Sequence, residues 1–338
     1  MRALVLAEFG RMEIREVPAP VVQNDEVLIK VDAVGICGSD VHGYTGANGR
    51  RVPGQVMGHE AAGIVLDGNG ELAAGRPVTF NPLIACGRCP ACKEGEQQHC
   101  PDRRVIGVNP EISAAFAEQV AVPVANVVAL PADFPIGYGA LIEPLAVAFH
   151  AVRRARVADH DQVVVIGGGP IGQSIVLAVR TRTTADILVS EPNAQRRELC
   201  ASLGATVLDP VAEPLDDQLR KLIGGFSDVT IDAVGQSRSI ADALRVTKVG
   251  GLVTLVGMGS PRLELSAFDV STAERTVVGS FCYSDADFRA AAQWAGDHPE
   301  LLAPLITDRV PLRRAPEAFA ALAGQAPAAG KIIVQPNA

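Results

Sequence analysis

The order of apolar and polar residues divides the chain into two regions that differ in the secondary structure they predict. Before residue 150, short apolar or alternating runs are separated by glycine and proline, and the clearest runs span residues 27–34, 62–66, 120–122 and 127–130. Residues 27–34 alternate and include β-branched side chains, which is typical of a half-buried strand. The first region is therefore predicted to be rich in short β-strands.

From residue 161 onward, strands and helices are expected to alternate. Residues 163–166 are apolar without alternation, as in a parallel strand that is buried on both faces, and a glycine-rich turn and a helix over 170–182 follow. The same order repeats, with strands expected at 187–190, 206–208, 228–232, 252–256 and 276–279 and helices at 194–203, 216–223 and 237–246. This alternation predicts an α/β fold with a doubly wound, parallel, six-stranded sheet.

The C-terminal segment of the chain is expected to belong with the first region. It carries two or three helical patterns from residue 285 and ends in a strand at 331–334, and we expect it to fold back on the first region. A chain of 338 residues exceeds one ordinary domain. We therefore predict one domain from residues 1–150 plus 283–338 and a second from residues 151–282.

Composition narrows the classes of function. Apolar residues make up 48% and charged residues 20%, which describes a globular protein with an ample core. The net charge of −8, with no basic cluster, argues against nucleic-acid binding, and no run reaches the roughly 18 apolar residues of a membrane span. The first residues lack the pattern of a secretory signal, so we expect a cytoplasmic protein that keeps its seven cysteines reduced or on metal.

Four cysteines, Cys86, Cys89, Cys92 and Cys100, follow the spacing C-x2-C-x2-C-x7-C. Four thiolates from one short lobe, about residues 85–101, can surround Zn²⁺ tetrahedrally and leave no open position, so the predicted site is structural. Disulfides are one alternative, but a reducing compartment disfavours them. An iron–sulfur cluster is another, although its usual run closes with a gap of about three residues rather than the longer gap seen here.

A dinucleotide site is predicted in the second region. Gly167, Gly169 and Gly172 form G-x-G-x-x-G between a predicted strand and a predicted helix. Glu191 follows at the end of the next strand, where an acid binds the ribose hydroxyls and repels a 2′-phosphate, so NAD is favoured over NADP. Arg196, with its neighbour at 197, could accept such a phosphate, although a solvated helix face would explain both arginines.

A second, open metal site is predicted in the first region. Cys37 and His59 lie in glycine-rich turns, and the carboxylate of Glu60 or of Glu143 could join them. One cysteine, one histidine and one carboxylate make a zinc site whose fourth position is open to water or an alcohol. Singly, such a cysteine or histidine is more often a buried or locally bonded side chain, so the interpretation rests on their combination.

These residues, with the segments G-H-E, A-L-I-E-P-L-A-V and G-G-G-P-I-G, resemble the zinc-dependent medium-chain dehydrogenases, and within them the sorbitol (polyol) dehydrogenase group. The resemblance covers nearly the whole chain and implies a GroES-like catalytic domain beside a Rossmann domain. It implies a catalytic zinc on Cys37, His59 and either glutamate, and a proton relay through Ser39, with Asp40 and His42 as neighbours. Its further implied cofactor contacts are Pro170, Ile171, Arg196, Val256, Gly257, Phe281 and Lys331.

Two positions depart from the pattern of that group. Cys282 stands in G-S-F-C-Y where arginine is common, and Gly43 stands where an aromatic residue commonly follows D-V-H. Both changes fall in the expected substrate pocket, whose walls we predict to include Tyr44, Phe116 and Tyr283. The expected reaction is oxidation of a secondary alcohol, a polyol or a diol, to a ketone by NAD. One alternative is an enzyme that oxidises an amino alcohol such as threonine. The other is a non-catalytic protein that binds a dinucleotide.

The resemblance also implies an assembly. Members of the family are usually homodimers or homotetramers whose cofactor-domain sheets continue across subunits. Residues 251–256 are a candidate for the edge that would join them. The expected partners are a small-molecule alcohol and further copies of the chain.

Overall fold

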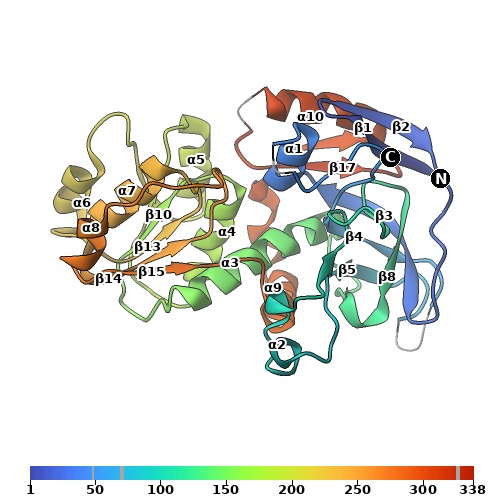
Figure 1. Cartoon of the computed structure of the whole chain (residues 1–338), viewed down its shortest axis with the longest axis horizontal. Coiled ribbons are helices and arrows are strands. Elements are labelled where there is room, and N and C mark those ends of the chain that lie inside the picture. The colour runs from blue at the N-terminus through green and yellow to red at the C-terminus, as the bar shows by residue number, and fades with distance from the viewer. Residues whose placement is uncertain (48, 69–71, 325–327) are drawn as a thin grey trace. The chain divides into compact units, whose positions relative to one another are not determined.

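The computed structural model describes residues 1–47, 49–68, 72–324 and 328–338, which divide into two compact units. The first unit comprises Met1–Ala146 and Tyr283–Ala338, and the second comprises Val147–Cys282. Both termini lie in the first unit (Figure 1). Within the described ranges, no helix combines the length and the apolar character that a membrane crossing needs.

The second unit is built on a parallel sheet of six strands in the order β12-β11-β10-β13-β14-β15. The strands are β10 Val163–Ile166, β11 Ile187–Ser190, β12 Thr206–Leu208, β13 Ser227–Asp232, β14 Thr247–Leu255 and β15 Thr276–Gly279. The helices are α3 Ile142–Arg154 (its later turns), α4 Pro170–Val179, α5 Ala194–Ser202, α6 Leu215–Ile223, α7 Ser237–Val246 and α8 Ala267–Ser271. The predicted doubly wound sheet is confirmed.

Strand β10 shows why its sequence lacks alternation. Val163 and Val165 belong to an apolar cluster with residues of α3, α4 and α5, whereas Val164 and Ile166 belong to a second cluster with residues of α6 and α7. Helices therefore cover both faces of the sheet (Figure 1). A strand in this position must be apolar at every residue.

The strand order also creates a switch point. The chain adds β11 and β12 on one side of β10 and then returns to place β13 on the other side. Ligands of open α/β sheets bind at the carboxyl ends of the strands at such a point, which is where the glycine motif lies. Residues 251–255 of the candidate edge at 251–256 instead belong to β14, which is an interior strand between β13 and β15. Its apolar run reflects burial between two neighbours, and the edge strands of this sheet are β12 and β15.

The first unit carries a sheet in the order β16-β17-β3-β4-β5-β9, with β8 also paired to β3. Its strands are β3 Glu26–Gly35, β4 Glu60–Val65, β5 Pro77–Phe80, β8 Gln119–Pro123, β9 Val127–Ala129, β16 Ile306–Pro311 and β17 Lys331–Gln335. Two small sheets complete the unit. One pairs β1 Arg2–Glu8 with β2 Arg11–Glu16, and the other pairs β6 Leu83–Ile84 with β7 Arg104–Val105. The helices are α1 Gly38–Tyr44, α2 Pro90–Lys93, the first turn of α3, α9 Asp285–Asp297 and α10 Ala315–Ala323. Antiparallel pairing of β17 with β3 brings the C-terminal segment onto the first unit.

Candidate functional site

Predicted site residues surround the start of helix α1. Cys37 is the N-cap residue, and its Sγ accepts a hydrogen bond from the backbone N–H of Ser39 at 3.5 Å. The Asp40 carboxylate accepts a hydrogen bond from the backbone N–H of Cys37 at 3.4 Å, which completes a capping box. Ser39 is half-buried, and His42 lies exposed in the last turn. The helix cap therefore fixes the position of the Cys37 thiol.

His59 and Glu60 approach Cys37 because β4 begins beside the end of β3. Glu60 is paired with Gly35 across these strands, and any side chain at position 35 would overlap the Glu60 carboxylate. One ligand atom from each of Cys37, His59 and Glu60 lies within 4.8 Å of the other two. The structure thus brings together three of the four residues predicted for the open metal site.

A buried acid and a buried arginine lie behind the histidine. Asp40 Oδ1 lies 3.4 Å from His59 Nδ1 and accepts a hydrogen bond from Arg51 Nη2 at 3.2 Å. Burial alone would raise the pKa of Asp40, but His59 and Arg51 hold that pKa below its usual value. Burial alone would lower the pKa of His59, but Asp40 and Cys37 raise it well above its ordinary value. A carboxylate in this position makes an imidazole a more basic metal ligand.

Lys331 is the partner of Glu60. Its Nζ lies 2.7 Å from both carboxylate oxygens and also donates to the backbone carbonyl of Ile36 at 3.4 Å. Lys331 Nζ donates a hydrogen bond to Oε1 of Glu60. The other oxygen of Glu60, Oε2, is buried and has no hydrogen bond. Burial alone would lower the pKa of Lys331, but Glu60 and Cys37 raise it, which keeps the ammonium group charged. A residue expected near the cofactor phosphates is therefore in contact with the metal cluster.

Glu143 is a second carboxylate beside the cluster, outside the group of three converging donors. It lies in the first turn of α3, and its Oε1 accepts a hydrogen bond from the hydroxyl of Tyr283 at 2.8 Å. The pKa of Glu143 is raised to about 7, chiefly by burial and also by Glu60, whereas His59, Tyr283 and Lys331 oppose the rise. These interactions place Glu143 within electrostatic reach of the other donors.

The cluster suits Zn²⁺. Its donors are one thiolate, one imidazole and one carboxylate, which is a zinc ligand set with an open position. The unbonded Oε2 of Glu60 is a buried acceptor that a cation would satisfy.

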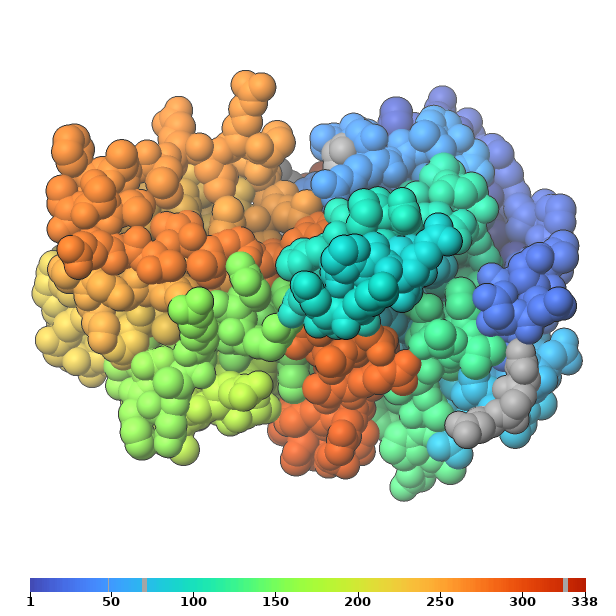
Figure 2. All heavy atoms as spheres, turned by 60° about the horizontal axis from the view of Figure 1, so that its bottom comes forward, coloured from blue at the N-terminus to red at the C-terminus, as the bar shows by residue number. Residues whose placement is uncertain are grey.

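The four cysteines of the predicted structural site converge in one lobe, residues 86–100, which lies at the surface (Figure 2). Their sulfurs lie within 4.8 Å of one another, and Cys86 Sγ is 4.0 Å from Cys92 Sγ, near the roughly 3.8 Å expected in a tetrahedral zinc–thiolate site. No cysteine of the described chain forms a disulfide. Backbone N–H groups lower the pKa of Cys86 to about 6, whereas burial raises that of Cys92 to about 12. The arrangement fits a closed zinc site.

In the second unit, the glycine motif forms the turn after β10. Gly167 has a φ of 97°, in the left-handed region that favours glycine, and a side chain at Gly172 would overlap the backbone oxygen of Gly167. Gly169 is the N-cap of α4 and offers no side-chain cap, so the first N–H groups of the helix are available to an anion. This geometry fits the pyrophosphate of a dinucleotide.

Charged residues border the glycine turn. The two oxygens of Glu191 accept hydrogen bonds from the backbone N–H groups of Gly168 and Asn193, each at 2.8 Å. Arg196 Nη1 lies 3.9 Å from the point where a Cβ on Gly169 would stand. An acid and a base thus lie where a ribose hydroxyl or a 2′-phosphate would be distinguished.

Arg197, the second arginine considered for a phosphate, has another partner. It forms an ion pair with Asp209 at 2.8 Å and donates to the backbone carbonyls of Glu191 and Pro192. Its role in the structure is to hold the segment after β11.

The other residues expected to contact the cofactor follow the carboxyl ends of strands in the second unit: Pro170 and Ile171 after β10, Val256 and Gly257 after β14, and Phe281 after β15. The backbone N–H groups of Val256 and Gly257 both donate to the carbonyl of Asp232 at 2.9 Å, and Phe281 is 38% exposed. These positions share one end of the sheet with the glycine turn.

Two of the three aromatic residues predicted to line the substrate pocket are packed in the hydrophobic core of the first unit instead. Tyr44 and Phe116 both contact Phe319, with ring centroids 5.8 Å and 5.4 Å apart, and Phe116 has no exposed surface. Both residues belong to the hydrophobic core cluster of the first unit.

Tyr283, the third aromatic, reaches the metal cluster through Glu143. Cys282, directly before it, is half-buried and has a φ of 49°, in the left-handed region. The G-S-F-C-Y segment therefore supplies a hydroxyl group to the cluster.

Sequence reasoning did not identify Arg51, or the contacts of Lys331 and Tyr283 with the two glutamates. The contacts join residues 11, 271 and 140 positions apart. No local pattern marks such pairs. The preference of a buried carboxylate for a cation or hydroxyl partner was the one available signal, and it does not say which partner.

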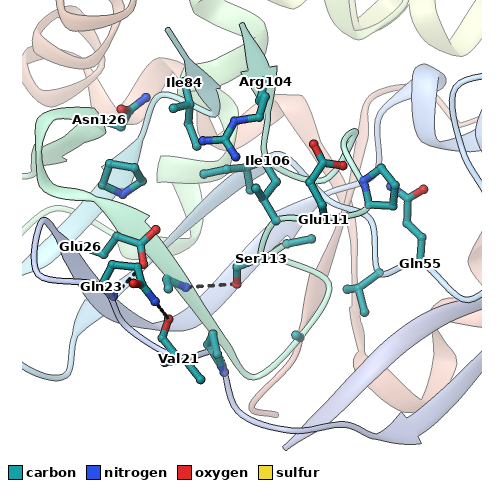
Figure 3. Close-up of a pocket in the computed structure, with 18 of the residues that line it drawn as sticks. Val21, Gln23, Glu26, Gln55, Ile84, Arg104, Ile106, Glu111, Ser113 and Asn126 are labelled. Carbon is teal, nitrogen blue, oxygen red and sulfur yellow. Dashed lines mark hydrogen bonds between the residues drawn. The ribbon is translucent and has the colours of Figure 1, made fainter. Parts of the chain in front are cut away.

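A separate pocket of about 800 Å³ opens on the first unit (Figure 3). Its lining includes Gln55, Arg104, Glu111, Ser113 and Asn126, and none of the predicted site residues. It is thus distinct from both metal clusters.

Comparison with known proteins places these sites in a family. The alcohol dehydrogenase GroES-like domain matches residues 23–132, and the zinc-binding dehydrogenase domain matches residues 170–297. L-galactonate-5-dehydrogenase from Escherichia coli is 36% identical over 90% of this chain and 89% of its own length. A sorbitol dehydrogenase from Arabidopsis thaliana is 34% identical over 83% of this chain and 80% of its own.

Comparison with solved structures supports the same family. A zinc-binding dehydrogenase from Sinorhizobium meliloti, bound to NADP, superposes with a TM-score of 0.90 at 31% identity and covers 99% of both chains. The fold of this chain therefore matches that of the neighbour over its whole length. The chain belongs to the zinc-dependent medium-chain dehydrogenase family.

Proposed function

We propose that this protein oxidises a secondary alcohol, a hydroxyl of a polyol, diol or sugar acid, to a ketone with NAD as acceptor. The observation that carries the proposal is the open cluster of Cys37, His59 and Glu60 in a chain that also carries the glycine turn. Relatives named for L-galactonate and sorbitol support this substrate class.

The first unit would hold two zinc ions, one in the four-cysteine lobe and one in the open cluster. At the open cluster, geometry favours Glu60 as the third ligand, because its carboxylate converges with Cys37 and His59. Glu143 would act as a second carboxylate held by Tyr283. Lys331 would keep Glu60 ionised and oriented.

When bound, Zn²⁺ would act as a Lewis acid that eases deprotonation of the alcohol, and NAD would accept the hydride. The residues of the chain would position these groups and move the proton. Ser39 and His42 are three residues apart on α1 and lie on one side of it. A proton released at half-buried Ser39 could therefore pass to exposed His42 and then to water.

The preference for NAD over NADP rests on Glu191. Its carboxylate is fixed beside the glycine turn by two backbone N–H groups, where it would meet the ribose hydroxyls and repel a 2′-phosphate. Arg196 borders the same turn and would moderate the preference.

Assembly into a homodimer or homotetramer would use the edge of the second unit's sheet. Strand β15 has one neighbour, and Val277 on it and Phe268 nearby are exposed to 37% and 75%. An exposed, apolar sheet edge favours pairing with another copy. Light scattering after size-exclusion chromatography would measure the number of subunits.

The function is tested by metal analysis and a substrate panel. We expect two zinc ions per chain and reduction of NAD, faster than of NADP, with sugar alcohols, vicinal diols or aldonates. Threonine and simple secondary alcohols belong in the same panel. Absence of bound zinc, together with no nicotinamide reduction by any of these compounds, would overturn the proposal.

A further inference from the structure

Arg51 is a buried cation in the loop between α1 and β4. Its side chain is 1% exposed, and its Nη2 donates to Asp40 Oδ1 at 3.2 Å. Its Nε is buried with no hydrogen-bond partner. Burying a guanidinium group with an unsatisfied N–H is costly, so the pairing with Asp40 must offset that cost.

Asp40 connects Arg51 to two metal-type donors. The Oδ1 that binds Arg51 is also 3.4 Å from His59 Nδ1, and Oδ2 accepts the backbone N–H of Cys37 at 3.4 Å. The side chain of Asp40 has no exposed surface. The rotamer of one buried carboxylate therefore affects the imidazole and the thiol together.

Gly43 provides the space for Arg51. A Cβ on Gly43 would overlap Cγ of Arg51 and press on its Cβ and Cδ. Gly43 lies within α1 and has no left-handed φ, so its backbone does not require glycine. Space for the arginine stem is the physical reason for glycine at this position.

We propose that Arg51 is a positioning residue for the open metal site and that it acts by holding Asp40 in place. Gly43 is coupled to Arg51, because only glycine at position 43 leaves room for the arginine side chain. The proposal rests on the zinc site proposed above. Without Arg51, the Asp40 carboxylate could rotate away from His59 and from the N–H of Cys37. The zinc ligands would then lose their fixed orientation while remaining in the sequence.

The test compares Arg51→Met, Arg51→Lys, Gly43→Ala and the double variant Gly43→Ala/Arg51→Met with the wild type. The control is Arg50→Met, which removes an exposed arginine next along the chain. Zinc release to a competing chelator measures affinity at the open site. The absorption spectrum of the Co²⁺-substituted protein measures ligand geometry, and thermal unfolding measures stability.

We expect Arg51→Met to weaken zinc binding about 10- to 100-fold and to alter the Co²⁺ spectrum. Arg51→Lys should recover part of the loss, because lysine keeps the charge without the planar fork. Gly43→Ala should change both readouts in the same direction, and its effect should largely disappear when Arg51 is already methionine. Arg50→Met should leave both unchanged.

Wild-type zinc affinity and an unaltered Co²⁺ spectrum in Arg51→Met would overturn the proposal, even if thermal stability falls. If Arg51→Met does not fold, Gly43→Ala decides: a folded Gly43→Ala protein with wild-type zinc release and spectrum would overturn it. Failure of the proposed function would look different, because the wild type itself would then bind no zinc at the open site.

Discussion

The hydroxyl of Tyr283 donates a hydrogen bond to Oε1 of Glu143 at 2.8 Å, although 140 positions separate the two residues. Both side chains are buried. The same arrangement recurs at Glu60 with Lys331 and at Asp40 with Arg51. Each of the buried carboxylates in and beside the open cluster thus has its own donor, and these donors make the burial of several acids together tolerable.

Replacing Tyr283 by phenylalanine removes the hydroxyl and keeps the ring. We expect a loss of about 1–2 kcal/mol in the free energy of unfolding, because a buried carboxylate oxygen loses its donor. Turnover should fall about 10-fold or more, as for other supports of a metal site. Urea unfolding and steady-state kinetics measure the two effects. Tyr138→Phe is the matched control, and equal behaviour of the two variants would contradict the assigned contact.

Lys331→Met leaves Glu60 buried without a cationic partner. An unpaired buried charge costs about 3–5 kcal/mol, and we expect a decrease of that order in the unfolding free energy of the metal-free protein. Lys248→Met removes an exposed pair with Asp228 and should cost about 1 kcal/mol or less. Similar losses for both variants in urea unfolding would show that Lys331 does not balance a buried charge.

The second unit could be predicted from the sequence because each of its strands leaves a strong local signal. The bounds of β10, Val163–Ile166, coincide with the predicted run, since burial on both faces requires four consecutive apolar residues. The hairpin of β1 and β2 was not predicted. Strand β2 is largely exposed and charged at four of its six positions, so its short alternation of charged and apolar residues is a weak signal.

The open site could be predicted in part, and its limits have a physical cause. Cys37 and His59 could be predicted because one cysteine, one histidine and one carboxylate together form a zinc ligand set. Arg51 and Tyr283 have no such signature, and their function depends on side-chain contacts that form only when the chain folds. The aromatic residues Tyr44 and Phe116 were placed at the pocket by position along the chain, whereas their packing against α10 places them in the core.

Removing one cysteine of the surface lobe should release one zinc ion and leave the other. In Cys89→Ser we expect one zinc per chain and a lower melting temperature, because the lobe has no hydrophobic core of its own to hold its fold. Cys200→Ala, in the second unit, should keep the wild-type zinc content, since burial raises the pKa of the Cys200 thiol to about 12 and keeps it away from metal chemistry. Elemental analysis and differential scanning calorimetry check both outcomes. Unchanged zinc content in Cys89→Ser would refute the structural site.

Gly172→Ala tests the dinucleotide site by adding one methyl group. That group would overlap the backbone oxygen of Gly167, so helix α4 and the turn after β10 must separate. We expect NADH affinity to fall at least about 10-fold, because the first N–H groups of α4 would leave the position of the pyrophosphate. The unfolding free energy should also decrease, by about 1–3 kcal/mol, as for other overpacked positions. Gly225→Ala is the control, because a Cβ there meets no atom within 4 Å. Fluorescence titration with NADH measures the affinity, and wild-type binding by Gly172→Ala would place the cofactor elsewhere.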